Sequence, residues 1–151
     1  MPKAAVEKVI VYTDGGSRGN PGPAALGVVI QDTARHTIKA YGEALGLKTN
    51  NEAEYSAVVS ALKKIKALFG KEKTKNMKVE MRMDSELVMR QLTGKYKIEM
   101  EKLFPLFIAV WNLKMDFKEV SFHHVPREEN KEADRMVNEA LDARETGSLF
   151  S

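Results

Sequence analysis

The chain has 151 residues, of which 43% are hydrophobic and 30% charged, a composition typical of one soluble globular domain. It contains no cysteine, which excludes disulfide and thiolate chemistry and is compatible with a reducing, cytoplasmic setting. No segment approaches the roughly 18 apolar residues of a membrane span, and a net charge of +3 does not by itself indicate a nucleic-acid partner.

The first third of the chain predicts three strands joined by turns. Residues 8–13 form a continuous apolar run typical of a central strand. Residues 14–25 are rich in glycine, proline, asparagine and serine and predict a long turn. Residues 26–30 predict a second strand and residues 37–44 a third, which Gly42 weakens. Consecutive strands joined in this way indicate an antiparallel meander.

The rest of the chain alternates helices with two more strands. Residues 51–69 carry apolar side chains at helical spacing. The other predicted elements are helices near residues 85–92, 103–113 and 130–143, and strands over residues 78–83 and 119–125. This order predicts an α/β fold with one five-stranded mixed sheet flanked by helices. We expect one domain over residues 1–151, with a core at about 8–143 and a frayed tail at about 146–151.

Four carboxylates lie at the edges of four different predicted elements: Asp14, Glu54, Asp84 and Asp134. Converging carboxylates resist ionisation unless cations join them, and oxygen ligands suit Mg²⁺ or Mn²⁺. Each acid alone also has an ordinary explanation. Asp14 and Asp84 could start turns, and Asp134 could complement a helix dipole.

Glu52 and Glu54 compete for the role of the helical acid. Glu54 shares a helical stripe with apolar Val58 and Ile65, whereas Glu52 shares one with Ser56. An acid that points toward the buried side is costly unless it has partners. Glu54 is therefore the functional candidate, and Glu52 is interpreted as a solvated acid at the start of the helix.

The segment 14–23 is the most specific string in the chain. Its glycines let the backbone approach a ligand closely, and exposed N–H groups could cradle a phosphate, although the Lys-Ser/Thr ending of a Walker loop is absent. Residues 12–16 with 19–23 resemble the opening of a type 1 ribonuclease H. Three further motifs resemble that family in its own order: Thr49-Asn50-Asn51-Glu52-Ala53-Glu54, Met83-Asp84-Ser85 and Asn130-Lys131-Glu132-Ala133-Asp134.

The resemblance implies a ribonuclease H-like fold and an endonuclease that hydrolyses the RNA strand of RNA–DNA hybrids, giving 5′-phosphate and 3′-hydroxyl ends. The four carboxylates would hold two Mg²⁺ or Mn²⁺ ions, one activating a water and the other stabilising the leaving 3′ oxygen. Cleavage of double-stranded RNA is a possible second activity, because both duplexes are A-like. A nucleic-acid-binding module of the same fold that has lost catalysis is the alternative, and we expect a monomer.

Substrate contacts are expected mainly to the backbone and the 2′-hydroxyl, and hence with little sequence specificity. By resemblance, Asn20 and Thr49 would grip a phosphate of the DNA strand. The full set of expected substrate contacts is Gly15, Gly16, Ser17, Gly19, Asn20, Thr49, Asn50, Asn51, Ser85 and Tyr96.

The chain departs from the longer members of the family in two places. Residues 92–97 run almost directly into the next helix, which resembles the short form without a basic protrusion. Tyr96 in this segment could stack on a base or sugar, or pack at a helix end. His124 is the closest match to a mobile catalytic histidine, but it could instead be packed or hydrogen-bonded on the strand face that it shares with Phe122. Arg127 could approach the scissile phosphate.

Overall fold

The computed structural model describes the backbone of residues 6–150 and the side chains of residues 6–146. One five-stranded sheet has the order β3-β2-β1-β4-β5. The first three strands are antiparallel, and β4 and β5 run parallel to β1. The predicted mixed sheet is therefore confirmed. Its strands are β1 (Lys8–Ser17), β2 (Gly22–Gln31), β3 (Thr37–Lys48), β4 (Lys78–Met83) and β5 (Glu119–His124).

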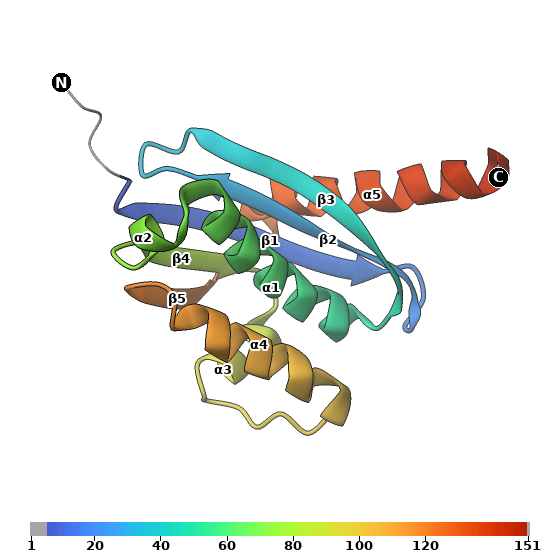
Figure 1. Ribbon diagram of the computed structural model, residues 1–151. Helices are drawn as coiled ribbons and strands as arrows, with labels where there is room; N and C mark the ends of the chain where they lie inside the picture. The colour runs from blue at the N-terminus through green and yellow to red at the C-terminus, as the bar shows by residue number, and fades with distance from the viewer. Residues whose placement is uncertain (1–5, 151) are drawn as a thin grey trace.

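Helices cover the sheet on both faces (Figure 1). α1 and α4 lie on one face, and α5 lies on the opposite face against β1, β2 and β3. The helices are α1 (Asn50–Phe69), α2 (Lys71–Thr74), α3 (Glu86–Leu92), α4 (Phe104–Lys114) and α5 (Lys131–Phe150), with 3-10 turns η1 (Glu101–Leu103) and η2 (Arg127–Glu129). In the part of the chain described, no helix is long and apolar enough to cross a membrane.

The main core lies between the sheet and α1. Val79, Met81 and Met83 of β4 are buried there, whereas the alternate residues Glu80 and Arg82 are half-buried on the other face. This alternation follows from the two-residue period of a strand. Tyr55 of α1 is fully buried. Its hydroxyl is satisfied there by donating a hydrogen bond to Gln91 Oε1 at 2.8 Å.

The predicted long turn over residues 14–25 is wrong. β1 continues to Ser17 and β2 begins at Gly22, with Gly15 paired to Leu26 and Ser17 to Ala24. The strands continue because glycines here let neighbouring backbone pack closely, which overrides their low strand propensity.

Two other predicted ends also differ from the structure. β3 extends to Lys48, past the predicted end at residue 44, because Gly46 adopts φ +79° beside an irregularity in the β2–β3 pairing and the strand resumes. α5 is helical to Phe150, past the predicted helix end at residue 143, because a single glycine at position 147 weakens a helix without stopping it. Ser151 lies outside the described residues.

Candidate functional site

Parallel pairing of β1 and β4 brings two of the predicted acids to one edge of the sheet. Tyr12 pairs with Arg82, so Asp14 and Asp84 follow at matching positions, where β4 ends. Glu54 reaches the same place from α1. A narrow cleft is lined by Thr13, Asp14, Glu54, Met83, Asp84 and Ser85. Three acids predicted from distant segments therefore lie in one cleft.

The start of α1 is fixed by a capping box, which places Glu54. The Thr49 hydroxyl accepts a hydrogen bond from the Glu52 N–H at 3.1 Å, and Glu52 Oε1 accepts one from the Thr49 N–H at 3.1 Å. Glu52 is therefore a capping residue, which is more specific than the solvated acid expected from sequence. Glu54 Oε2 is buried without a hydrogen-bond partner among the described residues.

Gly15 lets β1 approach α1 at this point. A Cβ on Gly15 would lie 2.3 Å from the carbonyl carbon of Ala53 and 2.4 Å from the Glu54 nitrogen. The close approach that sequence assigned to a ligand is thus made by the protein's own helix. Contact between the Gly15 backbone and a substrate stays a prediction.

α5 is anchored beside Asp14 by contacts that the sequence did not reveal. The buried Asn130 amide donates a hydrogen bond to the Thr13 carbonyl oxygen at 2.9 Å. Gly27 and Gly42 lie under α5, where a Cβ would meet the Ala133 and Met136 carbonyl oxygens at 2.1 and 2.2 Å. The helix backbone therefore rests directly on the sheet and brings Asp134 near Asp14. The glycine within each strand was the sequence signal for this close approach.

Burial and mutual repulsion oppose ionisation of two of the acids. Burial raises the pKa of Asp14 to about 8, and the negative charges of Asp84 and Asp134 add to the increase. Burial also raises the pKa of Glu54 to about 7, helped by Asp84 and opposed by the Ser85 hydroxyl and by Arg127. Raised pKa values in a cleft are typical of functional sites.

The donor set fits a divalent cation. Its oxygens come only from carboxylates, one of them is buried and unpartnered, and burial of like charge would be relieved by a cation. No three acidic or histidine side chains among the described residues already form a closed metal cluster.

The stability of the metal-free protein should depend on pH. Since the pKa values of Asp14 and Glu54 are raised from 3.8 and 4.5 to about 8 and 7, the folded state binds more protons than the unfolded state in this range. The free energy of unfolding should therefore fall by several kcal/mol as pH rises from about 4 to about 8. Thermal melts in chelator measure this. Millimolar Mg²⁺ or Mn²⁺ at pH 8 should reverse the loss, and a melt indifferent to both would contradict the site.

Three expected substrate contacts form a network between the β1–β2 turn and α1. Asn50 Oδ1 accepts hydrogen bonds from the Ser17 N–H at 2.9 Å and from the Ser17 hydroxyl at 3.1 Å. Asn20 Oδ1 accepts one from the Asn50 N–H at 3.0 Å. Gly19 adopts φ +100° in this turn, which favours glycine. The network fixes the turn beside the cleft, and each asparagine also has an amide NH₂ group with which to donate.

Three further residues expected to contact the substrate lie on α1, on β1 and at the N-terminus of α3. Ser85 caps α3 by accepting a hydrogen bond from the Val88 N–H at 3.2 Å. Asn51 is half-buried in the first turn of α1. At Gly16 an added Cβ would meet only Val137 Cγ1, at 3.8 Å. Their contacts with a substrate stay predictions.

The auxiliary candidates are on the surface near the acids. His124 is exposed at the end of β5, paired with Met83, so the alternative of a packed histidine is wrong. Arg127 lies on η2 with its side chain 90% exposed and its Nε 3.8 Å from Asp84 Oδ2. Tyr96 is half exposed, with the Arg90 guanidinium 5.4 Å from its ring centroid. Residues 93–100 contain no helix, which confirms that no helical protrusion separates α3 from η1.

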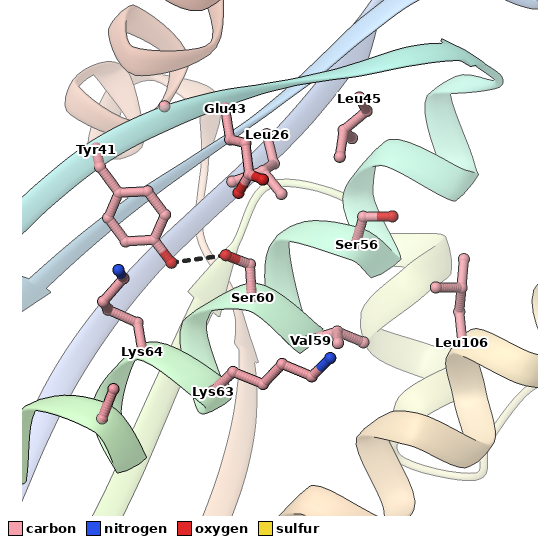
Figure 2. Close-up of a pocket in the computed structure, with 12 residues that line it drawn as sticks. Leu26, Tyr41, Glu43, Leu45, Ser56, Val59, Ser60, Lys63, Lys64 and Leu106 are labelled. Atoms are coloured by element: carbon pink, nitrogen blue, oxygen red, sulfur yellow. Dashed lines mark hydrogen bonds between the residues drawn. The ribbon is translucent and has the colours of Figure 1, made fainter.

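A larger hollow of about 590 Å³ lies elsewhere, between β3, α1 and α4 (Figure 2). Its lining includes Tyr41, whose hydroxyl lies 2.7 Å from the Ser60 hydroxyl, together with Lys63, Lys64 and Leu106. None of the four acids lines it. The candidate site is thus the narrow cleft and not this larger hollow.

Known proteins are similar to this chain in both sequence and fold. A family model described as reverse transcriptase-like matches residues 12–140. The ribonuclease HI of Halobacterium salinarum is 41% identical over 135 residues, 89% of this chain and 65% of that protein. A bifunctional protein of Mycobacterium tuberculosis is 37% identical over 137 residues, and the chain spans 36% of its length.

Solved structures agree with these matches. LC11-RNase H1 in complex with an RNA/DNA hybrid is 44% identical, with a TM-score of 0.86 over 90% of this chain and 98% of that one. The RNase H1 of Halobacterium salinarum is 40% identical, with a TM-score of 0.82 over 90% of this chain and 98% of that one. With the motifs in their expected order and the fold matched over nearly its whole length, the chain belongs to the type 1 ribonuclease H family.

Proposed function

We propose that the chain is a metal-dependent endoribonuclease that hydrolyses the RNA strand of RNA–DNA hybrids and leaves 5′-phosphate and 3′-hydroxyl ends. The observation that carries this proposal is the gathering of Asp14, Glu54 and Asp84 in one cleft, with Asp134 close enough for its charge to act on Asp14. LC11-RNase H1, a relative crystallised with an RNA/DNA hybrid, supports the choice of substrate.

The four acids would hold two Mg²⁺ or Mn²⁺ ions. When bound, such ions supply a polarised water and stabilise charge on the leaving 3′ oxygen. The protein contributes acids from four separate elements, kept together by the Thr49 capping box and the Asn130 anchor. Because these hydrogen bonds hold the elements that carry the acids, the acids should need little rearrangement when the substrate arrives.

Substrate binding would use the network between the β1–β2 turn and α1. Asn20 and Thr49 would contact a phosphate of the DNA strand, and Asn50 and Asn51 would reach the minor groove with its 2′-hydroxyls. The remaining contacts would come from Gly15, Gly16, Ser17, Gly19 and Ser85. Since these groups recognise backbone rather than bases, cleavage should have little sequence specificity.

Arg127 and His124 would assist from the rim of the site. The Arg127 guanidinium, beside Asp84, suits a phosphate oxygen. His124 lies exposed at the end of β5, where it could help products leave. Tyr96 would stack on a sugar or base. Each is auxiliary, so its replacement should weaken cleavage without abolishing it.

The deciding experiment compares labelled RNA–DNA hybrid, single-stranded RNA, duplex RNA and duplex DNA in Mg²⁺, Mn²⁺ or chelator. We expect metal-dependent cutting of the RNA strand of the hybrid only, with 5′-phosphate ends on the products. Cutting of duplex RNA as well would extend the substrate class. Binding of the hybrid without cutting in either metal would overturn the proposal in favour of a catalytically silent module.

A further inference from the structure

The β1–β2 turn, residues 18–21, carries two of the proposed substrate contacts, Gly19 and Asn20. On its α1 side the turn is held by Asn50, whose N–H donates a hydrogen bond to Asn20 Oδ1 at 3.0 Å. Gly19 adopts φ +100°, and glycine restricts the backbone less than any other residue. A second support on the other side of the turn would therefore help to fix the position of Asn20.

Arg18 supplies such a support by tying the turn to α5. Its Nη1 donates a hydrogen bond to Glu145 Oε1 at 2.6 Å, and its Nη2 donates one to Asp142 Oδ1 at 2.7 Å. The two acids are three residues apart, so they lie on the same side of the helix. A planar guanidinium that bonds two carboxylates at once is fixed in direction as well as in distance.

The part of α5 that carries these two acids lies beyond the packed part of the helix. Leu141 is the last buried residue of α5 among the side chains that the structure describes. Asp142 and Glu145 are 67 and 61% exposed, and α5 runs on past the ends of the strands in Figure 1. Burial of apolar side chains therefore does not explain this end of the helix, whereas its ion pairs with Arg18 tie it to the turn.

We propose that Asp142 and Glu145 are positioning residues, which hold Arg18 and thereby set the β1–β2 turn for binding of the RNA–DNA hybrid. This role rests on the proposed function. The first turn of α5 carries Asp134, so one helix would fix both the fourth acid and the turn. The turn would bind the hybrid equally in the ground state and the transition state. Loss of the support should therefore raise KM and leave kcat within about twofold.

Removal of the two acids is a test in which charge and positioning predict opposite results. Asp142→Asn with Glu145→Gln, called the two-acid variant below, removes two negative charges from a protein that would bind a polyanion. Electrostatics alone would therefore lower KM for the hybrid. Positioning predicts instead that KM rises about three- to tenfold at fixed salt.

Glu72→Gln with Glu119→Gln is the matched control for charge. Both acids form exposed ion pairs, at 3.8 and 3.9 Å. Glu119 begins β5 and Glu72 lies on α2, before β4 begins, so both lie at the opposite end of the strands from the cleft. This variant loses the same charge as the two-acid variant, and its KM should be unchanged or slightly lower.

Arg18→Gln shows whether Arg18 acts through the two acids or touches the substrate itself. In the parent chain this substitution should raise KM about three- to tenfold. In the two-acid variant it should add less than about twofold, because the contact is already lost. An equal effect of Arg18→Gln in both backgrounds would overturn the positioning role.

Hydrogen exchange of the turn separates failure of this role from failure of the proposed function, since it needs no cleavage. The Arg18 N–H, bonded to the Pro23 carbonyl oxygen at 2.8 Å, and the Asn50 N–H should exchange about three- to tenfold faster in the two-acid variant. Amides of β4 should not change. A parent chain that cleaves no hybrid would refute the function, and exchange would still test the support. Unchanged exchange, or a KM that is unchanged or lower without the two acids, would overturn the role.

Discussion

Asp14→Asn should remove hybrid cleavage while the fold survives. Asparagine has nearly the same shape as aspartate but cannot supply a negative oxygen, so one shared ligand of the proposed cations would be lost. A loss of several kcal/mol of transition-state stabilisation corresponds to a rate roughly 10³-fold lower. The measurement is the cleavage rate on labelled hybrid, beside a thermal melt in chelator.

The Asp14→Asn substitution should raise the stability of the metal-free protein although it removes cleavage. Ionised Asp14 is costly in the metal-free fold, since its pKa is raised to about 8. Removing that charge should raise the melting temperature in chelator at pH 8, and the gain should vanish near pH 4, where Asp14 is protonated in the folded protein. An inactive variant that is also less stable at pH 8 would indicate damage to the fold rather than loss of a ligand.

Glu54→Gln and Glu52→Gln provide a matched pair on one helix. Glu54 Oε2 is buried and unpartnered, so Glu54→Gln should also lose cleavage. Glu52 works through the capping box, which glutamine can also complete, so Glu52→Gln should keep cleavage within a few-fold. Full activity in Asp14→Asn or Glu54→Gln, or equal loss in both glutamate variants, would contradict the site.

Sequence predicted the elements of this fold better than their ends. Alternation in residues 78–83 identified β4 with its observed bounds, because one face of that strand is buried and the other is partly exposed. The end of β1 was missed, because glycine-rich sequence is typical of turns and nothing local indicates that α1 will press against Gly15. Close backbone contacts between distant segments leave little trace in local propensity.

The acids themselves could be found from sequence, but their supports could not. Asp14, Glu54, Asp84 and Asp134 stood out by position and motif. Their convergence depends on the parallel pairing of β1 with β4 and on the height of α5 above the sheet. Both are tertiary features, so the sequence could name the ligands without showing how near one another they lie.

Gly27→Ala should destabilise the fold strongly, because Gly27 packs directly against the backbone of α5. Gly27 pairs with Asp14 on one side and with Gly42 on the other. A methyl group there would lie 2.1 Å from the Ala133 carbonyl oxygen, which is backbone and cannot rotate away. Lifting α5 to relieve this contact should cost about 1–3 kcal/mol, judged from overpacked cores, and would displace Asp134.

Urea unfolding measures this cost, and Gly16→Ala is its control. At Gly16 the added methyl would meet only Val137 Cγ1 at 3.8 Å, an ordinary contact. Alanine also restricts the unfolded chain, which favours folding by about 0.4–1 kcal/mol where the site has room. Gly16→Ala should therefore be neutral or slightly stabilising. A Gly27→Ala protein as stable as Gly16→Ala would show that α5 does not rest on β2 as described.

Activity in Gly27→Ala separates the placement of Asp134 from stability. At a temperature where the variant is fully folded, cleavage should still be slower than in the parent chain, because Asp134 immediately follows the displaced Ala133. A higher Mg²⁺ or Mn²⁺ concentration should recover part of the rate if the displaced acid mainly weakens cation binding. Destabilisation with an unchanged rate would mean that Asp134 tolerates the shift, and that the row of Asp14, Gly27 and Gly42 serves the packing of α5 alone.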